Sequence, residues 1–263
     1  MLGLLNTVLS KGNTLLTYVK DGLVMANRFL TPPKLTFPVD ASAEFNGTSD
    51  YIELPNDIIT DTDNYTLGAW YYFDTQTTND SILSFGYSAS DTPVINLELV
   101  SGGIAVQGFH RLDNSNNSTL THTISTSGEW NYLVVTKDES NHKLYLNGSV
   151  VSSNSSATTG TLTFDRISIG SLYRVANINF LAGNLANVAI WNRALSSDEI
   201  NSVMWKSYEG LEGAESNGLQ AWYSLDDITS PAASLANMEQ LATDKNATIE
   251  NKAAITAAIN ALS

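Results

Sequence analysis

Apolar and polar residues alternate along much of this chain, and the alternation predicts β-strands. The clearest example is 129–151, EWNYLVVTKDESNHKLYLNGSVV, where an apolar strand, a polar turn at 138–141 and a second strand at 143–146 follow one another. Asn147 and Gly148 tolerate a positive φ, so they favour a tight reversal into a third strand. The stretch therefore predicts a three-stranded meander, whose apolar face must be covered by a second layer.

The aromatic run 70–73, WYYF, lies at the end of another apolar stretch. Because alternate residues of a strand face opposite sides, either Trp70 with Tyr72 or Tyr71 with Phe73 is expected to form a core pair. A platform on which sugar rings stack is the alternative interpretation of this aromatic density.

Two further tryptophans stand in strand-like sequence, Trp130 and Trp191. Both are expected to be core residues of the sandwich rather than ligand platforms. Additional strands are predicted at 81–85, 94–99 and 104–106.

Two runs rich in Asn, Ser and Thr, 113–127 and 152–159, interrupt the apolar pattern. They predict long surface loops or hairpin tips, which are the usual place for binding residues on a rigid scaffold. Their amides and hydroxyls suit hydroxyl-rich ligands, and they suit ordinary solvated loops equally well. The candidate ligand-binding residues are Asp113, Asn114, Asn116, Asn117 and Asn154.

The two ends of the chain differ from its middle. Residues 1–40 place Leu and Val at loosely helical spacing, broken by glycines and closed by two prolines. This N-terminal arm is expected either to dock on a partner or to pack, as a strand-and-helix piece, on its own sandwich. A jelly roll at 41–208 follows, and then 209–263 with a linker, an edge strand from 218 and a terminal helix at 247–262.

Composition narrows the function classes. The chain of 263 residues has 13 basic and 27 acidic residues, a formal charge of −14, which argues against nucleic acid or an anionic membrane as partner. It contains no cysteine and hence no disulfide framework. The first residues lack a basic leader and an uninterrupted apolar run, so we expect no secretion signal or membrane span. A protein of this kind would leave a cell by another route, such as packaging into a particle.

Catalytic constellations are missing from the sequence. Glycoside hydrolysis needs two carboxylates at a fixed separation, yet Glu98 is the one carboxylate of its predicted strand. His110, His122 and His142 are isolated in sequence and are expected at the surface or in loops. No serine stands in a G-x-S-x-G setting. We therefore expect no enzymatic activity, no catalytic residue and no organic cofactor.

Several pieces, in order, resemble the laminin-G-like, concanavalin A-like jelly rolls. The W-x-Y-L-V-V-T and K-L-Y-L-N-G strands of the meander are similar to the middle of that family's domain. The other pieces that carry the resemblance are AEFNGTSDYIEL at 43–54, YTLGAW at 65–70, ISIG at 167–170 and FLAGNLANVAIWNRAL at 180–195. The resemblance covers about 41–206 and implies an all-β fold, a two-sheet antiparallel jelly-roll sandwich.

The resemblance also raises calcium as a candidate ion. Asn46 and Asp50 offer the oxygen ligands that calcium prefers, and they are the candidate metal ligands. Where the family often has paired acids before its closing strand, this chain has Ala186 and Asn187, which speaks against a family-type site. The alternative is that Asn46 and Asp50 form the turn between two strands.

A second resemblance points to a biological setting. The segment INSVMWKSY at 200–208, followed by a strand of the form G-L-x-x-W-Y-x-L-D at 218–226, is similar to structural proteins of tailed bacteriophages. It implies a non-enzymatic, oligomeric protein on the virion surface, a capsid decoration or a tail-fibre adhesion module, assembled in the host cytoplasm. Other virion proteins, held through the two ends of the chain, and glycans are the implied partners. A cellular carbohydrate-binding lectin and a glycan hydrolase are the alternatives.

Overall fold

The structure is a computed structural model of the chain, and it describes residues 5–10, 13–18, 42–73, 79–100, 105–124 and 128–225. The chain divides into two units, Met1–Phe37 and Pro38–Ser263. In the first unit, strands β1 (Leu5–Ser10) and β2 (Asn13–Tyr18) pair as an antiparallel hairpin. The loosely helical spacing of this segment was therefore misleading, because its described backbone is extended.

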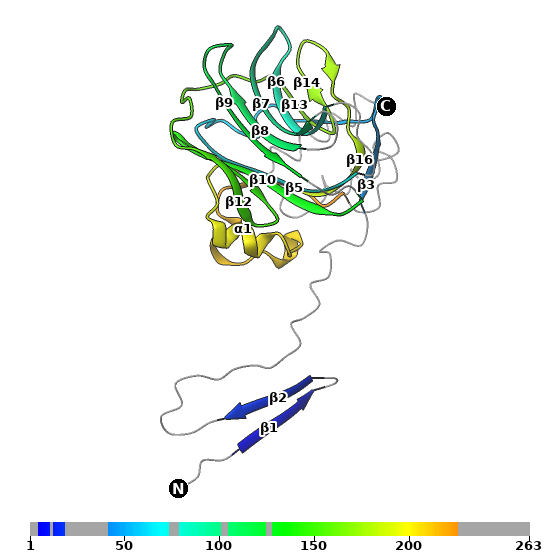
Figure 1. Cartoon of the computed structure of the whole chain (residues 1–263), viewed down its shortest axis with the longest axis vertical. Helices are drawn as coiled ribbons and strands as arrows, with labels where there is room; N and C mark the ends of the chain where they lie inside the picture. Colours follow the sequence, from blue (N-terminus) through cyan, green and yellow to red (C-terminus); the bar gives the residue numbers. More distant parts are fainter. Residues whose placement is uncertain are drawn as a thin grey trace. The chain divides into compact units, whose positions relative to one another are not determined.

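The second unit is a sandwich of two antiparallel sheets (Figure 1). The first sheet has seven strands in the order β12-β11-β10-β5-β16-β17, with β3 also paired to β16. Its strands are β3 (Ala43–Asn46), β5 (Asn64–Tyr72), β10 (Asn131–Asp138), β11 (Asn141–Leu146), β12 (Ser149–Asn154), β16 (Ala182–Trp191) and β17 (Leu219–Tyr223).

The second sheet has six strands in the order β4-β13-β6-β7-β8-β9. Its strands are β4 (Ile52–Leu54), β6 (Asp80–Tyr87), β7 (Ser90–Val100), β8 (Ala105–Arg111), β9 (Asn117–Thr123) and β13 (Arg166–Ile169). A small hairpin of β14 (Leu172–Tyr173) and β15 (Asn177–Ile178) completes the strands. The predicted all-β, two-sheet jelly roll is confirmed.

The meander predicted at 129–151 forms β10, β11 and β12. Asn147 and Gly148 join β11 to β12 with φ of 50° and 80°, as a tight reversal requires. A Cβ at position 148 would lie 2.1 Å from Oδ1 of Asn201, so a larger residue there would displace that side chain. Asn201 Nδ2 also donates to the Gly148 carbonyl at 3.1 Å, so the turn is fastened to the helix.

The core lies between the sheets, and alternation along β5 shows how it is filled. Tyr71 and Phe73 point into it with stacked rings 6.0 Å apart, which confirms them as a core pair. Trp70 is also buried, but on the opposite, outer face of the sheet. There its Nε1 donates to the Met204 carbonyl at 2.9 Å, and its ring lies 5.4 Å from that of Trp205.

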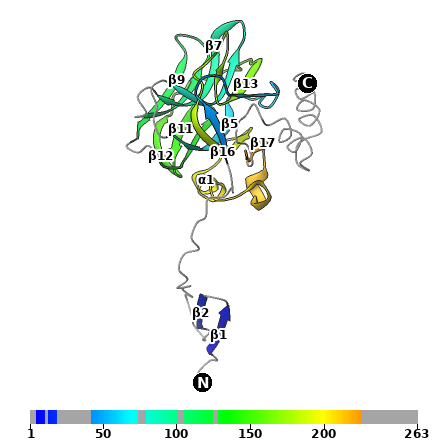
Figure 2. The same cartoon turned by 90° about the vertical axis from the view of Figure 1, so that its right-hand side faces the viewer.

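Helix α1 (Ser197–Val203) covers part of this outer face (Figure 1 and Figure 2). A capping box begins it: Ser196 Oγ accepts from the Glu199 amide, and the Glu199 carboxylate accepts from the Ser196 amide. Ile200 and Val203 are buried against the sheet. The segment after Trp191 thus covers part of the outer face of the seven-stranded sheet. In the part of the chain that the structure describes, it does not cover the outer face of the six-stranded sheet.

The two predicted core tryptophans differ. Trp191 is fully buried and its Nε1 donates to the Glu215 carbonyl at 2.8 Å, so that prediction is confirmed. Trp130 is only half-buried, with its ring 5.7 Å from that of Tyr72, so its assignment to the core was wrong. It immediately precedes β10 on the outer-face register of Tyr132, at the rim of the sheet rather than between the sheets.

The C-terminal part of the described chain is held to the sandwich. Strand β17 pairs with β16 at the end of the seven-stranded sheet, where it forms an edge strand. Between α1 and β17 lie two short 3-10 turns, Tyr208–Gly210 and Gly213–Ser216. Glu215 is buried in the second and accepts from Lys206 Nζ at 2.7 Å. The helix predicted at 247–262 lies outside the described residues.

One end of the core is polar, which corrects the sequence interpretation of the histidines. His110 and His142 are fully buried, while His122 is half-buried. Position 110 belongs to the set of alternate residues of β8 that face inward, and position 142 belongs to the inward-facing set of β11. Both rings therefore point between the sheets. His110 Nδ1 lies 3.2 Å from the Tyr65 hydroxyl, and His142 Nδ1 lies 2.9 Å from Ser118 Oγ.

A buried lysine joins the histidines. Lys137 Nζ pairs with the Asp63 carboxylate at 2.7 Å and donates to the Glu139 carbonyl at 2.6 Å. Burial, together with this positive charge, lowers the pKa of His110 to about 3. Burial, the neighbouring His110 and Lys137 lower the pKa of His142 to about 3 as well. Both rings are therefore neutral in the folded protein near pH 7.

Replacing Trp191 by Ala should lower the free energy of unfolding by about 3 to 5 kcal/mol, because it empties a fully buried aromatic site. Trp130→Ala should have a clearly smaller effect, since that ring is only half-buried. Urea unfolding of the two variants measures the difference. Equal losses for both variants would contradict the burial described here.

The histidines should make the sandwich acid-sensitive. Their folded pKa of about 3 lies below the ordinary value of 6.5, so their stabilising effect is complete above pH 6.5 and is lost as the pH falls toward 3. Each histidine contributes a slope of up to about 1.4 kcal/mol per pH unit in that window. His142→Gln should remove one such contribution from the free energy of unfolding measured between pH 7 and pH 5.

The matched control is His122→Gln, which changes a half-exposed ring outside the core. It should leave the slope of stability against pH as in the unmodified protein. If His142→Gln and His122→Gln give the same slope, the buried histidines are not the source of the acid sensitivity.

Candidate functional site

The outer face of the six-stranded sheet carries polar groups on its central strands. On β7, Asn96 and Glu98 face outward, because Ile95, Leu97 and Leu99 point into the core. The register of β8 places Phe109 opposite Asn96 and Gln107 opposite Glu98. Arg111 is the next outward residue of β8. These five side chains, Asn96, Glu98, Gln107, Phe109 and Arg111, make up the β7–β8 face.

The β14–β15 hairpin lies beside this face, seated on β6. A Cβ at Gly86 would lie 2.1 Å from the Tyr173 carbonyl oxygen, so only glycine allows the hairpin to approach so closely. Ser84 and Ser168 both donate to the Ser171 carbonyl, at 2.8 and 2.9 Å. The serines hold the hairpin in place, and Arg174 at its tip reaches β7, where it donates to the Asp91 carbonyl at 3.1 Å.

Glu98 is the most perturbed carboxyl group of the face. Its Oε2 accepts from Asn96 Nδ2 at 2.8 Å, and Asn96 Oδ1 in turn accepts from Ser81 Oγ at 2.5 Å. Burial raises the pKa of Glu98 to about 7, against the opposing effect of Arg174 and Arg111. Within the described residues no donor reaches its Oε1, although the side chain remains 6% exposed. The carboxyl group is therefore close to half-ionised near neutral pH and has one oxygen free.

Arg111 lies on the face without an acidic partner. Its guanidinium carbon is 4.4 Å from the centre of the Phe109 ring, a cation–π contact that orients the group. Within the described part of the chain it has no ion pair and no hydrogen bond, and its Nε is buried without a partner. An unpaired, oriented guanidinium is suited to bidentate binding of a carboxylate or phosphate.

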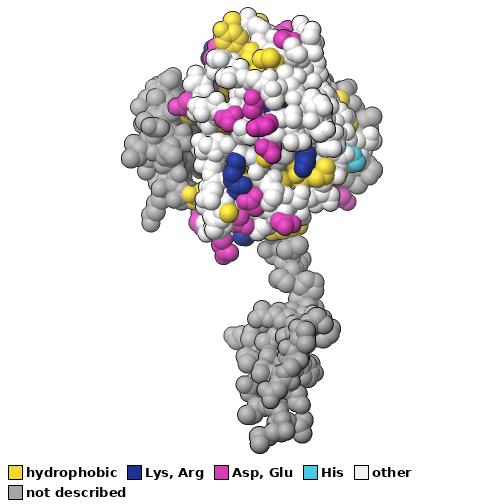
Figure 3. Space-filling view, turned by 90° about the vertical axis from the view of Figure 1, so that its left-hand side faces the viewer, with side chains coloured by type: hydrophobic (Ala, Val, Ile, Leu, Met, Phe, Trp, Pro, Cys, Tyr) yellow, Lys and Arg dark blue, Asp and Glu magenta, His cyan; other side chains and the backbone are white. Residues whose placement is uncertain are grey.

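The distribution of arginine supports this assignment. The chain has five arginines and a formal charge of −14. Arg111, Arg166 and Arg174 lie on this side of the six-stranded sheet, and Arg166 is 5.0 Å from the Tyr173 ring. Elsewhere the surface is acidic: on the side that carries β9 and β12, more acidic than basic side chains are visible (Figure 3). These three arginines lie among the carboxyl groups of Asp91 and Glu98, and Arg174 pairs with Asp91 at 3.4 Å, so Arg111 is the arginine of this side that has neither an ion pair nor a hydrogen bond within the described residues.

The β7–β8 face can bind but offers little for hydrolysis. Two positions before Glu98 on the same strand stands Asn96, an amide, so β7 lacks the pair of carboxylates that glycoside hydrolysis requires. Glu98 and Gln107 can accept and donate hydrogen bonds to hydroxyl groups, and Arg111 can hold an anion. The arrangement suits an acidic, hydroxyl-rich ligand.

The predicted metal ligands lie in one turn. Asn46 Oδ1 accepts from the backbone amides of Thr48, Ser49 and Asp50, and Asp50 Oδ2 accepts from the Asn46 amide. These are the bonds of a turn former. Among the described residues, no group of three or more His, Cys, Asp or Glu side chains is placed to hold a metal ion. The calcium site at Asn46 and Asp50 stays a prediction.

The two predicted binding loops lie together. Asn154 Nδ2 donates to Ser118 Oγ at 3.1 Å, which joins the end of β12 to the start of β9, next to Asn117. Much of each run is strand rather than loop, since β9 takes Asn117–Thr123 and β12 ends at Asn154.

The loop tip itself is tied internally. Asp113 Oδ1 accepts from the amides of Ser115 and Asn116, and its Oδ2 accepts from Asn116 Nδ2. The Asn116 amide group lowers the pKa of Asp113. Asn114 is exposed at the tip. These residues are brought to one rim of the sandwich, and their binding role stays a prediction.

The chain belongs to the concanavalin A-like lectin/glucanase superfamily, because the model of that family matches residues 46–201. Its fold is accordingly the one that the lectins and glucanases of this superfamily share. A search of curated protein sequences gives no significant match. None of the helices in the described residues is both long enough and apolar enough to cross a membrane.

Solved structures with the same fold come from several proteins. A candidate carbohydrate-binding protein from Bacteroides ovatus is 18% identical with a TM-score of 0.52, covering 71% of this chain, and this chain spans about half, 51%, of that protein. A CBM40 module of the Ruminococcus gnavus IT-sialidase, bound to α2,3-sialyllactose, is 16% identical with a TM-score of 0.51, over 62% of this chain and 96% of the module. The NanB sialidase of Streptococcus pneumoniae is 15% identical with a TM-score of 0.53, over 62% of this chain and 27% of the enzyme. These likenesses establish the fold.

Sequence reasoning missed Arg111 and the role of Glu98 in the β7–β8 face. Glu98 was noted only as a lone carboxylate, and Arg111 was not singled out. A usable signal was present, because Phe109 and Arg111 alternate with inward residues of β8 and so share its outer face. The approach of Arg174 depends on the hairpin seated on Gly86, for which the sequence carries no local signal.

Glu98→Gln should change how stability depends on pH. The folded pKa of about 7 lies above the ordinary value of 4.5, so the stabilising effect of Glu98 is complete below pH 4.5 and is lost as the pH rises through 7. At pH 8 the variant should be more stable than the unmodified protein by up to about 3 kcal/mol, and near pH 4.5 the two should agree. Urea unfolding across this range tests it, and parallel curves would refute the raised pKa of this buried carboxyl group.

Proposed function

We propose that this protein is a non-enzymatic, glycan-binding structural protein of a bacteriophage, exposed on the particle as a capsid decoration or a tail-fibre adhesion module. Its binding surface is the β7–β8 face. The observation that carries the binding part is the unpaired guanidinium of Arg111, held over Phe109 and close enough to Glu98 to affect its pKa.

The ligand class follows from the groups on the face. Arg111 supplies a fixed positive charge, and Glu98 and Gln107 supply hydrogen bonds for hydroxyls. An acidic oligosaccharide combines both needs. The fold supports this proposal, since a CBM40 module of similar fold binds sialyllactose.

The virion setting rests on sequence resemblance and on the N-terminal hairpin. The pattern at 200–208 and 218–226 is similar to tailed-bacteriophage structural proteins. Strands β1 and β2 form a two-stranded hairpin in a unit of their own, Met1–Phe37. Such a hairpin is marginally stable in water without further strands or a covering surface. We therefore propose that the ends of the chain bind other virion proteins in an oligomeric particle assembled in the host cytoplasm.

Absence of catalysis is part of the proposal. The amide of Asn96 stands where a second carboxylate would be needed on β7, and Glu98 has its Oε2 bonded to that amide. A carbohydrate-binding protein of a cell is the nearest alternative, and it would use the same face. The two differ in whether the protein is a component of purified particles.

The glycan part is tested by binding to an array of neutral and acidic oligosaccharides. The unmodified protein should retain acidic glycans, with sialyllactose as the first probe, and Arg111→Gln should weaken this retention at least about tenfold because a charge-assisted hydrogen bond is lost. The matched control is Arg193→Gln, which alters an arginine of the other sheet whose guanidinium is held by Glu199. Binding that survives Arg111→Gln unchanged would refute the assignment of the face.

The virion part is tested by mass analysis of purified phage particles and by deletion of residues 1–38. The truncated protein should melt like the full chain, because the sandwich has its own core, and it should fail to enter particles. A truncated protein that is incorporated normally would show that attachment lies elsewhere. Absence of the protein from particles would favour the cellular lectin.

A further inference from the structure

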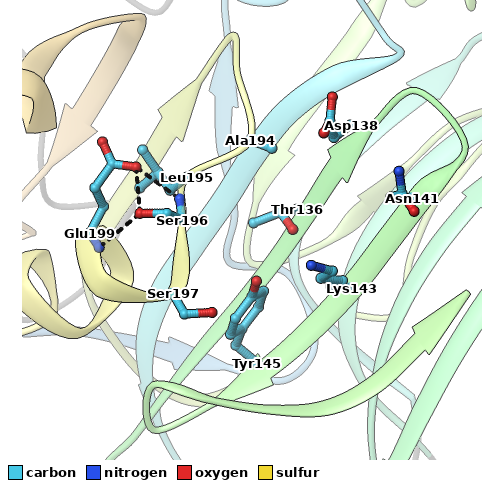
Figure 4. A pocket seen from close by; sticks show the side chains of 10 residues that line it. All are labelled: Thr136, Asp138, Asn141, Lys143, Tyr145, Ala194, Leu195, Ser196, Ser197 and Glu199. Atoms are coloured by element: carbon cyan, nitrogen blue, oxygen red, sulfur yellow. Dashed lines mark hydrogen bonds between the residues drawn. The ribbon is translucent and has the colours of Figure 1, made fainter. Parts of the chain in front are cut away.

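A pocket of about 590 Å³ lies on the outer face of the other, seven-stranded sheet (Figure 4). It is bounded by the β10–β11 hairpin on one side and by the segment that leads into α1 on the other. Its volume is within the range of roughly 300 to 1,000 Å³ that small-molecule sites occupy. It shares no residue with the β7–β8 face, the Asn-rich loops or the Asn46 turn.

The strand register explains why polar groups converge in the pocket. Lys143 pairs with Thr136 and Asn141 pairs with Asp138, so all four belong to one face of the β10–β11 hairpin. Tyr145 is the next residue of that face on β11. The intervening residues point into the core, so the hairpin turns its polar side toward the pocket. Figure 4 shows these side chains on the strands and Ser197 across from Tyr145.

The opposite wall is fixed by bonds of its own. Arg193 holds the Glu199 carboxylate with two hydrogen bonds, at 2.7 and 3.1 Å. Glu199 also accepts from Ser196, and this capping box keeps the start of α1 in place. The Arg193 pair and the cap lower the pKa of Glu199 to about 2. Glu199 and Ser196 therefore belong to the wall of the pocket, and the charge of Glu199 and the hydrogen bonds of both residues are satisfied within the protein.

Six other side chains of the pocket are not held by bonds of this kind. Among the described residues, no hydrogen bond or ion pair is made by the side chains of Thr136, Asp138, Asn141, Lys143, Tyr145 and Ser197. Thr136 and Tyr145 are only 3% and 2% exposed, yet neither hydroxyl is among the buried polar atoms that lack a partner, so both hydroxyls open toward the solvent in the pocket. Because no bond within the described residues occupies these polar groups, all six are available to a ligand that enters the pocket.

We propose that this pocket is a second ligand site, for a neutral polyhydroxyl compound of the size of one or two sugar rings. The charges of Lys143 and Asp138 are opposite, and the charge of Glu199 is balanced by Arg193. The pocket thus has no excess positive charge and does not favour an anion. Its hydroxyls and the Asn141 amide both donate and accept hydrogen bonds, as does each hydroxyl of a sugar. The site is independent of the proposed virion role and of Arg111.

The test is a nuclear magnetic resonance titration of the full chain with the methyl glycosides of glucose, galactose, mannose and N-acetylglucosamine. At least one glycoside should shift the backbone amides of 136–145 and 194–199. The double variant Thr136→Val, Tyr145→Phe removes two hydroxyls with little change of shape and should weaken that binding at least about tenfold. Lys143→Gln, at an exposed position, is the second variant should the double variant fold poorly, and it should weaken binding in the same way.

His122→Gln, which changes a half-exposed ring on β9 of the other sheet, is the matched control, and it should leave the titration unchanged. The proposal is overturned if none of the four glycosides shifts the pocket amides, if the shifts persist in the pocket variants, or if they occur around Arg111 instead. The last result would leave glycan binding by the β7–β8 face intact, so failure here and failure of the proposed function can be told apart.

Discussion

The apolar layer shared by the two sheets decides which side chains are free for function. Each strand that gives alternate residues to this layer must present the others outward, so the burial of Leu97 and Val135 also fixes the outward direction of Glu98 and Thr136. On the six-stranded sheet the outward set carries the unpaired Arg111. On the seven-stranded sheet α1 covers part of the outward set and leaves a polar pocket beside it. Both binding proposals are consequences of one packing constraint.

The same layer ends in polar groups rather than in more apolar ones. Lys137, His110 and His142 occupy inward positions, where Asp63 and Ser118 supply partners. A one-residue slip of either sheet would expose these side chains and bury charged neighbours such as Arg111, Asp138 and Lys143, so the polar end helps to specify register. It also makes the folded protein sensitive to acid. Burial favours the neutral form of both histidine rings, so protonating them lowers the free energy of unfolding.

Alternation made the fold predictable. The meander and the Tyr71–Phe73 pair follow from period-two patterning and from a turn that accepts positive φ. Trp130 was misjudged because patterning gives the face of a strand but not how far a neighbouring segment covers it. The site was harder to predict, since the β7–β8 face depends on a hairpin seated on Gly86 and the pocket depends on where α1 packs. Those contacts join residues that are distant in sequence. The composition of the chain instead favoured the Asn-rich loops as the binding site.

We propose that the unpaired guanidinium of Arg111 holds an acidic ligand. Nuclear magnetic resonance of the arginine side-chain Nε–H groups, during titration with sialyllactose, tests it most directly. The account predicts a shift of the Arg111 signal, while Arg193, held by two bonds to Glu199, stays unchanged. A titration in which Arg111 does not move, or in which Arg193 moves as much, would contradict the account.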